Sequence, residues 1–157
     1  MKMLAFHNPD EENGYLSNWY LSEFVINNIT YSSMEQYMMC MKAKCFDDFE
    51  MVDKIMSTND VAKIKQYGRE VNGYNENVWA GIRQIIVYEG LLAKFSQNEI
   101  LREQLLSTGD AILVECALKD RIWGIGRAMN DPQIFDINSW NGQNLLGYTL
   151  MLVRKKL

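Results

Sequence analysis

The chain has 157 residues, of which 48% are hydrophobic and 23% are charged, values that are typical of one soluble globular domain. Its formal net charge of −4 argues against non-specific binding to a phosphate backbone, which needs many lysine and arginine contacts. The cysteines at positions 40, 45 and 116 form no C-x-x-C pair, which excludes a disulfide framework or a zinc site. We therefore expect one cytoplasmic domain over residues 1–157, with no metal or other cofactor and no membrane segment.

The first part of the chain predicts a strand, a loop and a hairpin. Residues 3–8 favour a short opening strand, and the polar run at residues 9–14 favours a loop. Residues 24–31 are typical of a β-hairpin, because Asn27-Asn28 can take the positive φ values that a two-residue turn needs. His7 is the only histidine, and we interpret it as a surface or structural residue.

Residues 31–46 predict a helix with a clear start. Ser32 or Ser33 can accept hydrogen bonds from the free N–H groups of the first turn. Glu35 follows Ser32 at capping-box spacing. This helix is central to the functional argument, because it carries both a carboxylate and an amine.

Glu35 and Lys42 are seven residues apart, which places them within about 20° of each other on one helix face, with a rise of about 10 Å between them. Met38 and Met39 lie between them on that face. A carboxylate and an amine in this arrangement can approach one ligand from two ends. The alternative is a capping glutamate and a solvated lysine.

Four further helices are predicted, two of them short. One short helix starts at Asp47 or Asp48 and reaches about residue 56, and the other covers residues 60–67 and ends at Gly68. The longer helices cover 78–95, with helical spacing of apolar residues, and 98–107, with Thr108-Gly109 as its C-terminal cap.

Trp79 and Arg83 lie one turn apart on the longest of these helices and share a face. We consider them as ligand-binding residues. The alternative is that Trp79 belongs to the core and that Arg83 pairs with a nearby glutamate.

The last part of the chain predicts a strand, a glycine-containing turn and a helix. Residues 111–118 favour a buried strand, in which Glu115 must be paired or face a cleft. The turn at residues 120–126 reads D-R-I-W-G-I-G, and its backbone N–H groups can cradle a phosphate beside Arg127, although a plain turn is the alternative. Asn144 then caps a final helix over residues 145–156. In total we expect about six helices and a few short strands, which is a mostly helical α+β domain.

Eight motifs follow one another along the chain. The central helix carries Y-x-S-x-E-x-Y-M-x-x-x-K-A over residues 31–43. The others are L-S-N-W-Y (16–20), W-x-x-x-R (79–83), A-K-F (93–95), L-L-x-T-G-D (105–110), L-V-E (113–115), D-x-x-W-G-x-G (120–126) and N-x-L-G-x-x-L-M-x-V-R (144–154). In this order they resemble the YbiA-like, or NADAR, family over almost the whole chain. One departure is Gln36, where the family usually has histidine, which argues against a titrating imidazole at that position.

The candidate site combines polar groups with flat aromatic walls. We expect one cleft that contains Glu35, Lys42, Glu115, Asp120 and Arg127, with walls formed by Trp19, Trp79 and Trp123. Aromatic walls suit a nucleobase, and carboxylates flanking a sugar suit cleavage of a glycosidic bond. The predicted substrate-binding residues are Asn18, Trp19, Trp79, Arg83, Glu115, Trp123, Gly124, Gly126, Arg127 and Asn144.

The resemblance implies an N-glycosidase that breaks a bond between a ribose and an exocyclic amine. Lys42 is the lysine of the matching motif, and we predict that it attacks the ribose carbon and forms a Schiff base. This requires that burial or a cationic neighbour lowers the pKa of Lys42, and Lys44 and Arg127 are the candidates for such a neighbour. Glu35 or Asp120 would transfer the protons, one to the leaving amine and one from water.

Family members are known to act on two kinds of substrate. Some remove ADP-ribose from guanine in nucleic acid. Our leading expectation for this chain is the same activity, on guanine in nucleic acid or in nucleotides. Others act on phosphorylated intermediates of riboflavin synthesis, which is the alternative. A non-catalytic module that binds ADP-ribose or NAD is a third hypothesis. An ADP-ribosyltransferase toxin is a further expected partner.

Overall fold

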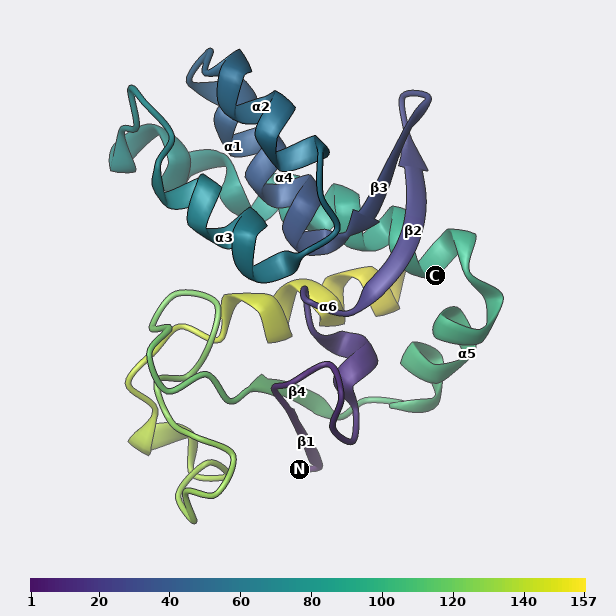
Figure 1. The fold of residues 1–157 in the computed structure, drawn as a ribbon. Helices are drawn as coiled ribbons and strands as arrows, with labels where there is room; N and C mark the ends of the chain where they lie inside the picture. The colour runs from purple at the N-terminus through teal and green to yellow at the C-terminus, as the bar shows by residue number, and fades with distance from the viewer. The chain divides into compact units, whose positions relative to one another are not determined.

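The computed structural model describes residues 1–157 and contains six α-helices, four strands and two short 3-10 helices. The chain divides into two compact units (Figure 1). Unit 1 consists of Met1–Tyr20 and Asn98–Leu157, and unit 2 consists of Leu21–Gln97. The predicted mostly helical α+β fold is confirmed. No helix combines the length and the apolar character that crossing a membrane requires.

Unit 2 holds a hairpin and four helices. Strands β2 (Leu21–Ile26) and β3 (Ile29–Ser33) pair antiparallel, and Asn27-Asn28 joins them with φ values of 52° and 66°. This is the predicted hairpin, with slightly longer strands. The helices are α1 (Met34–Cys45), α2 (Phe49–Met56), α3 (Val61–Arg69) and α4 (Glu76–Gln97).

Helix α1 is the centre of unit 2, since α2, α3 and α4 all pack against it (Figure 1). Most of its residues are buried. Its Tyr37 ring meets the Tyr31 ring of β3 edge to face at 4.9 Å and the Phe24 ring of β2 at 5.9 Å. These aromatic contacts join the hairpin to the first turn of α1.

The start of α1 confirms one of the two predicted capping serines and differs in the partner of the cap. Ser33 is the N-cap and accepts a hydrogen bond from the Gln36 backbone N–H at 3.1 Å. The Gln36 side chain in turn accepts from the Ser32 backbone N–H at 2.7 Å. The side chain that returns a hydrogen bond to the start of the helix is therefore that of Gln36 and not that of Glu35, and it accepts from the residue before the N-cap.

We expected helix α3 to end at Gly68, but it continues to Arg69. Gly68 faces α1, and a Cβ atom there would lie 1.9 Å from Met39 Sδ. The glycine is therefore used for the close approach of α1 and α3 and not as a helix stop.

Unit 1 is built on two parallel strands and two helices. Strand β1 (Met3–Phe6) pairs with β4 (Ile112–Glu115), and helix α6 (Leu145–Lys156) packs against β4. The other elements are α5 (Glu99–Ser107) and the 3-10 helices Gly14–Leu16 and Ile137–Ser139. Strand β4 is shorter than predicted and ends at Glu115, which places this carboxylate at a strand end.

Asn144 precedes α6, but its side chain does not cap that helix, contrary to the prediction. Instead, Asn144 Nδ2 donates to the Leu113 carbonyl and Asn144 Oδ1 accepts from the Glu115 backbone N–H, both at 2.9 Å. Asn144 is fully buried and has a φ of 51°. The residue therefore binds the edge of β4 and links that strand to α6.

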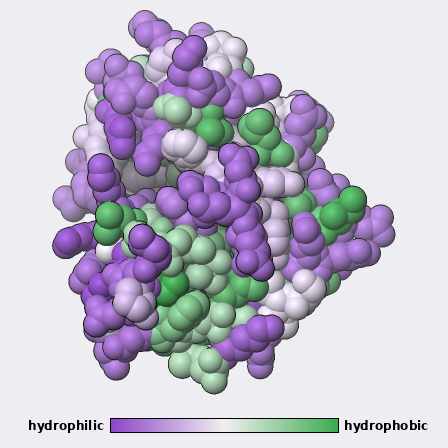
Figure 2. Space-filling model, turned by 60° about the horizontal axis from the view of Figure 1, so that its bottom comes forward, coloured by the Kyte–Doolittle hydropathy of each residue, from purple (hydrophilic) through white to green (hydrophobic).

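The surface is mixed in polarity. On the face that Figure 2 shows, hydrophilic side chains predominate and an apolar area lies among them. The most exposed large apolar residues include Leu21, Phe49, Ile100 and Leu118, which come from different elements. Single exposed apolar side chains of this kind are normal and do not define a binding surface.

Candidate active site

Lys42 lies half-buried on α1 beside an aromatic ring. Its Nζ atom is 4.5 Å from the centroid of the Tyr74 ring, which is the geometry of a cation–π contact. Tyr74 belongs to the segment between α3 and α4, and its ring packs edge to face on Phe46 with centroids 5.4 Å apart. The Tyr74 ring therefore contacts both the Lys42 amine and the Phe46 ring.

A chain of polar contacts continues from Tyr74. Its hydroxyl donates to a carboxylate oxygen of Glu76, and the other oxygen accepts from Arg83 Nη1 at 3.1 Å. Arg83 is 8% exposed, and its buried Nε has no acceptor within the protein. The alternative that Arg83 pairs with a nearby glutamate is therefore confirmed.

The surroundings lower the pKa of the Lys42 amine. Burial is the main cause, and the Arg69 guanidinium adds to it, whereas the carboxylates of Glu35 and Glu76 oppose it. The prediction of a lowered pKa thus agrees with the structure. The cation that contributes is Arg69 and not Lys44 or Arg127, which were the predicted candidates.

The titration of the neighbouring groups reflects the same contacts. Burial, together with the hydrogen bond to Glu76, raises the pKa of Tyr74 to about 12. The hydrogen bond from Tyr74, followed by the contact with Arg83, lowers the pKa of Glu76. Glu76 is consequently an anion, and Tyr74 a neutral phenol, around neutral pH.

Glu35 is the second residue of α1 and is only 4% exposed. The methionines on the predicted face are buried as well, with Met38 5% and Met39 7% exposed. Trp79 is 4% exposed, one turn before Arg83 on α4. Glu35 is therefore a buried carboxylate that acts electrostatically on Lys42, as its position seven residues away predicted.

Three of the predicted residues of unit 1 are Glu115, at the end of β4, and Asn18 and Trp19, in the segment before β2. Glu115 is 8% exposed, and its Oε1 lies 3.3 Å from Nδ1 of His7. Asn18 is 6% exposed, and its buried Oδ1 has no donor within the protein. Trp19 beside it is partly buried.

The turn from Asp120 to Gly126 is held by its own polar groups. Asp120 Oδ1 accepts from the backbone N–H groups of Ile122 at 2.9 Å and Trp123 at 2.8 Å. A Cβ atom on Gly124 would lie 2.8 Å from the Ala117 Cβ, and Gly126 has a φ of +70°. The two glycines therefore satisfy the needs of the turn itself, which is the alternative we noted for this motif.

Two further predicted residues use their polar atoms within unit 1. Arg127 donates from Nη1 to Asp131 at 2.7 Å and from Nε to the Ser139 carbonyl at 2.8 Å. Asn144 binds β4 as described above. Their substrate contacts stay predictions, as does the arrangement of all the predicted residues in one cleft.

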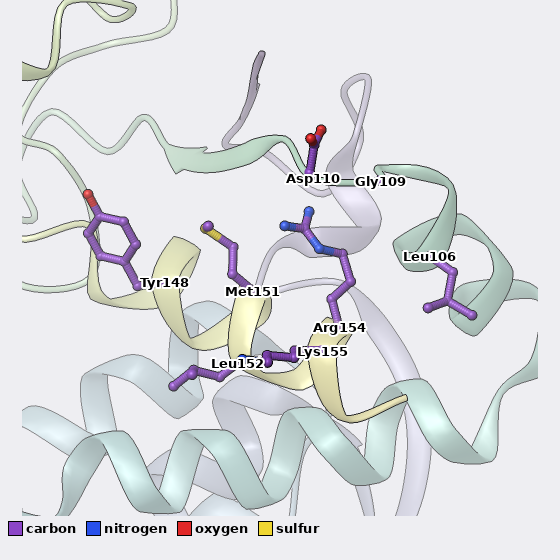
Figure 3. A pocket seen from close by; sticks show the side chains of 8 residues that line it. All are labelled: Leu106, Gly109, Asp110, Tyr148, Met151, Leu152, Arg154 and Lys155. Atoms are coloured by element: carbon purple, nitrogen blue, oxygen red, sulfur yellow. The ribbon is translucent and has the colours of Figure 1, made fainter. Parts of the chain in front are cut away.

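A surface pocket of about 690 Å³ lies in unit 1 between the end of α5 and one face of α6 (Figure 3). Arg154 extends toward Asp110, and its Nη1 donates to Thr108 Oγ1 and to the Ala111 carbonyl, both at 2.9 Å. None of the predicted site residues lines this pocket, whose walls are formed by Leu106, Gly109, Asp110, Tyr148, Met151, Leu152, Arg154 and Lys155. Arg154 thus fixes the turn before β4. We place the candidate active site at Lys42, which does not line this pocket.

The sequence did not indicate that three residues near Lys42 belong to the site, namely Tyr74, Glu76 and Arg69. The run N-G-Y-N-E-N at residues 72–77 reads as a loop, which hid the first two. One signal was present: Glu76 and Arg83 have the same seven-residue spacing as Glu35 and Lys42. No local pattern joins Tyr74 to Lys42, since these residues lie on different elements.

Unit 2 thus contains a helix-borne lysine with a lowered pKa, surrounded by carboxylates, guanidinium groups and an aromatic ring, an arrangement typical of an enzyme that uses an amine nucleophile. Comparison with known proteins agrees with this class. The family model described as the NADAR domain matches residues 5–157. The chain belongs to the NADAR domain family.

Three relatives illustrate the relationship. An N-glycosidase of Acanthamoeba polyphaga mimivirus is 44% identical over 80% of this chain and 74% of that protein. A riboflavin biosynthesis protein of Vibrio vulnificus is 33% identical over 98% of this chain, which spans only 38% of that longer protein. The NMR structure of the E. coli protein YbiA superimposes with a TM-score of 0.81 at 26% identity, covering 99% of this chain and 84% of that one. The predicted class, a hydrolase of N-glycosyl bonds, agrees with the relatives that are named N-glycosidases.

Proposed function

We propose that this chain is an N-glycosidase that hydrolyses the bond between a ribose anomeric carbon and an exocyclic amine, with Lys42 as its nucleophile. The observation that carries the proposal is the placement of Lys42, half-buried beside Tyr74 with a lowered pKa. A lowered pKa increases the fraction of neutral amine near neutral pH, and only the neutral amine can attack carbon.

The reaction proceeds through an open-chain sugar. The bond between the anomeric carbon and the ring oxygen breaks, the ring oxygen takes a proton, and the exocyclic nitrogen loses its proton and forms an imine. The Lys42 amine adds to this imine carbon and expels the exocyclic amine, which leaves with the two protons that the Lys42 nitrogen gives up. Water then adds to the Schiff base, and collapse of the adduct releases the sugar aldehyde and the neutral lysine. The net change is addition of one water and loss of one N-glycosyl bond.

Glu35 is the group in unit 2 best suited to move these protons. It is a buried carboxylate on the helix of Lys42, and it acts electrostatically on the amine. A carboxylate in this position can take a proton from the adding amine and return it to the leaving nitrogen. The predicted role of Asp120 in proton transfer remains a separate hypothesis.

The substrate that we propose is ADP-ribosylated guanine, in a single strand or as a nucleotide. Arg83 supports a phosphorylated ligand, because a buried guanidinium N–H without an acceptor in the protein favours an acceptor from the ligand. The net charge of −4 disfavours a long duplex as the bound form. We further propose a cytoplasmic location and, as partner, the ADP-ribosyltransferase that modifies the guanine.

The second candidate is an N-glycosidase that acts on phosphorylated intermediates of riboflavin synthesis. The riboflavin biosynthesis protein of Vibrio vulnificus, which aligns with 98% of this chain, favours it. Such intermediates also carry a phosphate and a bond from ribose to an amine, so that Lys42 and Arg83 would serve the same purposes. The two candidate substrates differ in the leaving base and in the second phosphate and adenosine that ADP-ribose carries.

The test is incubation of the purified protein with an oligonucleotide ADP-ribosylated on guanine, followed by mass spectrometry. We expect unmodified oligonucleotide and free ADP-ribose to appear together. Reduction with borohydride during turnover should leave the sugar attached to Lys42 through a stable secondary amine. Lys42→Ala should lose activity by at least about 1000-fold, because the covalent route is then closed.

Lys44→Ala is the matched control, since it removes a lysine from the same helix two residues away, and it should retain activity. An untouched oligonucleotide together with cleavage of a phosphoribosyl-amine would replace the leading substrate by the second candidate. Binding of ADP-ribose by the wild type and by Lys42→Ala, without turnover of either substrate, would establish a non-catalytic binding module instead.

A further inference from the structure

Tyr74 combines high exposure with contacts on three sides. It is 41% exposed, in the segment that joins α3 to α4, where side chains are usually free to move. Yet its ring face meets the Lys42 ammonium, its ring packs edge to face with Phe46, and its hydroxyl donates to Glu76. An exposed tyrosine adds little to a core, so that this degree of fixation calls for another explanation.

Glu76 is held in turn by a buried residue. Its second oxygen accepts from Nη1 of Arg83, which is 8% exposed. The orientation of the exposed Tyr74 ring is thus set by a guanidinium fixed on α4, through the first residue of that helix. The contacts run in one continuous series from Arg83 through Glu76 and Tyr74 to Lys42.

We infer that Tyr74 is a positioning residue for Lys42, anchored by Glu76 and Arg83, and that its ring fixes where the amine stands before substrate arrives. This rests on the proposed role of Lys42 as nucleophile. A lysine has four rotatable side-chain bonds, and an unrestrained amine spends little time in a geometry suited to attack. A ring that covers one side of the ammonium restricts both its position and its hydration.

The charged and titratable groups around Lys42 come from every neighbouring element. Glu35 stands on α1, Arg69 on α3 and Glu76 on α4, and Tyr74 contributes its ring from the segment between α3 and α4. Burial is the main cause of the lowered Lys42 pKa, so that removing the covering ring should hydrate the ammonium and raise the pKa. Removing the charge of Glu76 should act in the opposite direction, because that carboxylate favours the ammonium.

The experiment is trace acylation of the ligand-free protein with acetic anhydride over a series of pH values, with each lysine followed by peptide mass spectrometry. The midpoint of the Lys42 profile reports its titration without any substrate. In Tyr74→Ala we expect the midpoint to move to higher pH. In Tyr74→Phe, which keeps the ring, it should stay in place, and in Glu76→Gln it should move to lower pH.

Tyr148→Ala is the matched control, because Tyr148 is 39% exposed and lies on α6 in unit 1. It should leave the Lys42 midpoint unchanged, and far-UV circular dichroism of every variant checks that the helical fold is retained. A midpoint in Tyr74→Ala that equals the wild-type value, or lies below it, would overturn the inference.

Turnover separates this inference from the proposed function. If the wild type cleaves substrate, Tyr74→Ala should lower turnover at pH 7 by about tenfold and move the pH optimum upward, and Tyr74→Phe should restore both. If the wild type cleaves no substrate while Tyr74→Ala still shifts the Lys42 midpoint, the positioning role stands and the proposed function fails. If Tyr74→Ala changes neither the turnover of substrate nor the midpoint of the Lys42 profile, the inference fails and the proposed function stands.

Discussion

Gln36 uses its whole amide group within unit 2. Its Oε1 accepts from the Ser32 backbone N–H and hydroxyl, and its Nε2 donates to the carbonyls of Ile55 at 3.1 Å and Thr58 at 3.0 Å. The residue is 2% exposed. It therefore ties the first turn of α1 to the end of α2.

We predict that Gln36→His destabilises the protein by about 1–3 kcal/mol, because a neutral imidazole offers one donor and one acceptor and leaves a buried carbonyl unsatisfied. Unfolding in urea measures the difference. Gln97→His is the control, since Gln97 also bonds the backbone of Val25 through both ends of its amide but is exposed. The exposed substitution should have less than half the effect, and equal losses for both would contradict the role given to Gln36.

The same variant bears on catalysis at this position. Because the Gln36 side chain is directed at backbone groups, an imidazole there should not raise turnover. An increase in activity in Gln36→His would show that the position contributes to the chemistry.

At the scale of elements, helix α4 contains two glycines with opposite surroundings. A Cβ atom on Gly90 would lie 2.6 Å from Cδ2 of Tyr37 and 2.7 Å from Cε of Met34, both in the buried face of α1. A Cβ atom on Gly81 would have no atom within 4 Å. Gly90 thus permits the close packing of α1 on α4, and Gly81 has no such function.

We predict opposite effects for alanine at these two positions. Gly81→Ala should stabilise the protein by about 0.5–1 kcal/mol, because alanine is the better helix former. Gly90→Ala should destabilise it by about 1–3 kcal/mol, since the Tyr37 ring cannot yield without displacing β3. Both are read from urea unfolding at the same pH. Stabilisation by Gly90→Ala would mean that α1 and α4 adjust to the added methyl group.

At the scale of the whole molecule, Lys94 couples stability to pH. Its side chain is fully buried, and burial lowers its pKa to about 7. An unfolded lysine titrates near its ordinary pKa of about 10.4. Between these values the unfolded state binds more protons than the folded state, and the free energy of unfolding therefore rises with pH.

We predict that wild-type stability, compared with that of Lys94→Met, rises by about 1.4 kcal/mol per pH unit between pH 7.5 and 8.5. Above this window the buried Cys116 thiol acts in the opposite sense, because burial raises its pKa to about 12 while the unfolded thiol ionises earlier. Urea unfolding across the pH series gives the difference directly. Lys63→Met, at an exposed position, should leave the slope of the wild type unchanged. Parallel slopes for wild type and Lys94→Met would contradict the prediction.

Most of the elements could be predicted from the sequence, because their signals are local. The hairpin follows from Asn27-Asn28 between two apolar runs, and α2 and α5 start at the polar residues Asp48 and Asn98, whose side chains accept from the first turn. The seven-residue spacing of Glu35 and Lys42 places them on one helix face whatever the rest of the chain does. The ordered motifs were sufficient to indicate the family, which the comparison confirmed.

Contacts between elements were decided only by the tertiary structure. The Tyr74 ring over Lys42, Asn144 against β4 and Gly68 against Met39 each join residues of different elements. Spacing within one helix follows from a fixed rise and rotation, whereas the approach of two elements depends on how all their side chains fill the space between them. For that reason the sequence by itself determined the elements, the family and the central lysine, and the packing of those elements decided what holds that lysine in place.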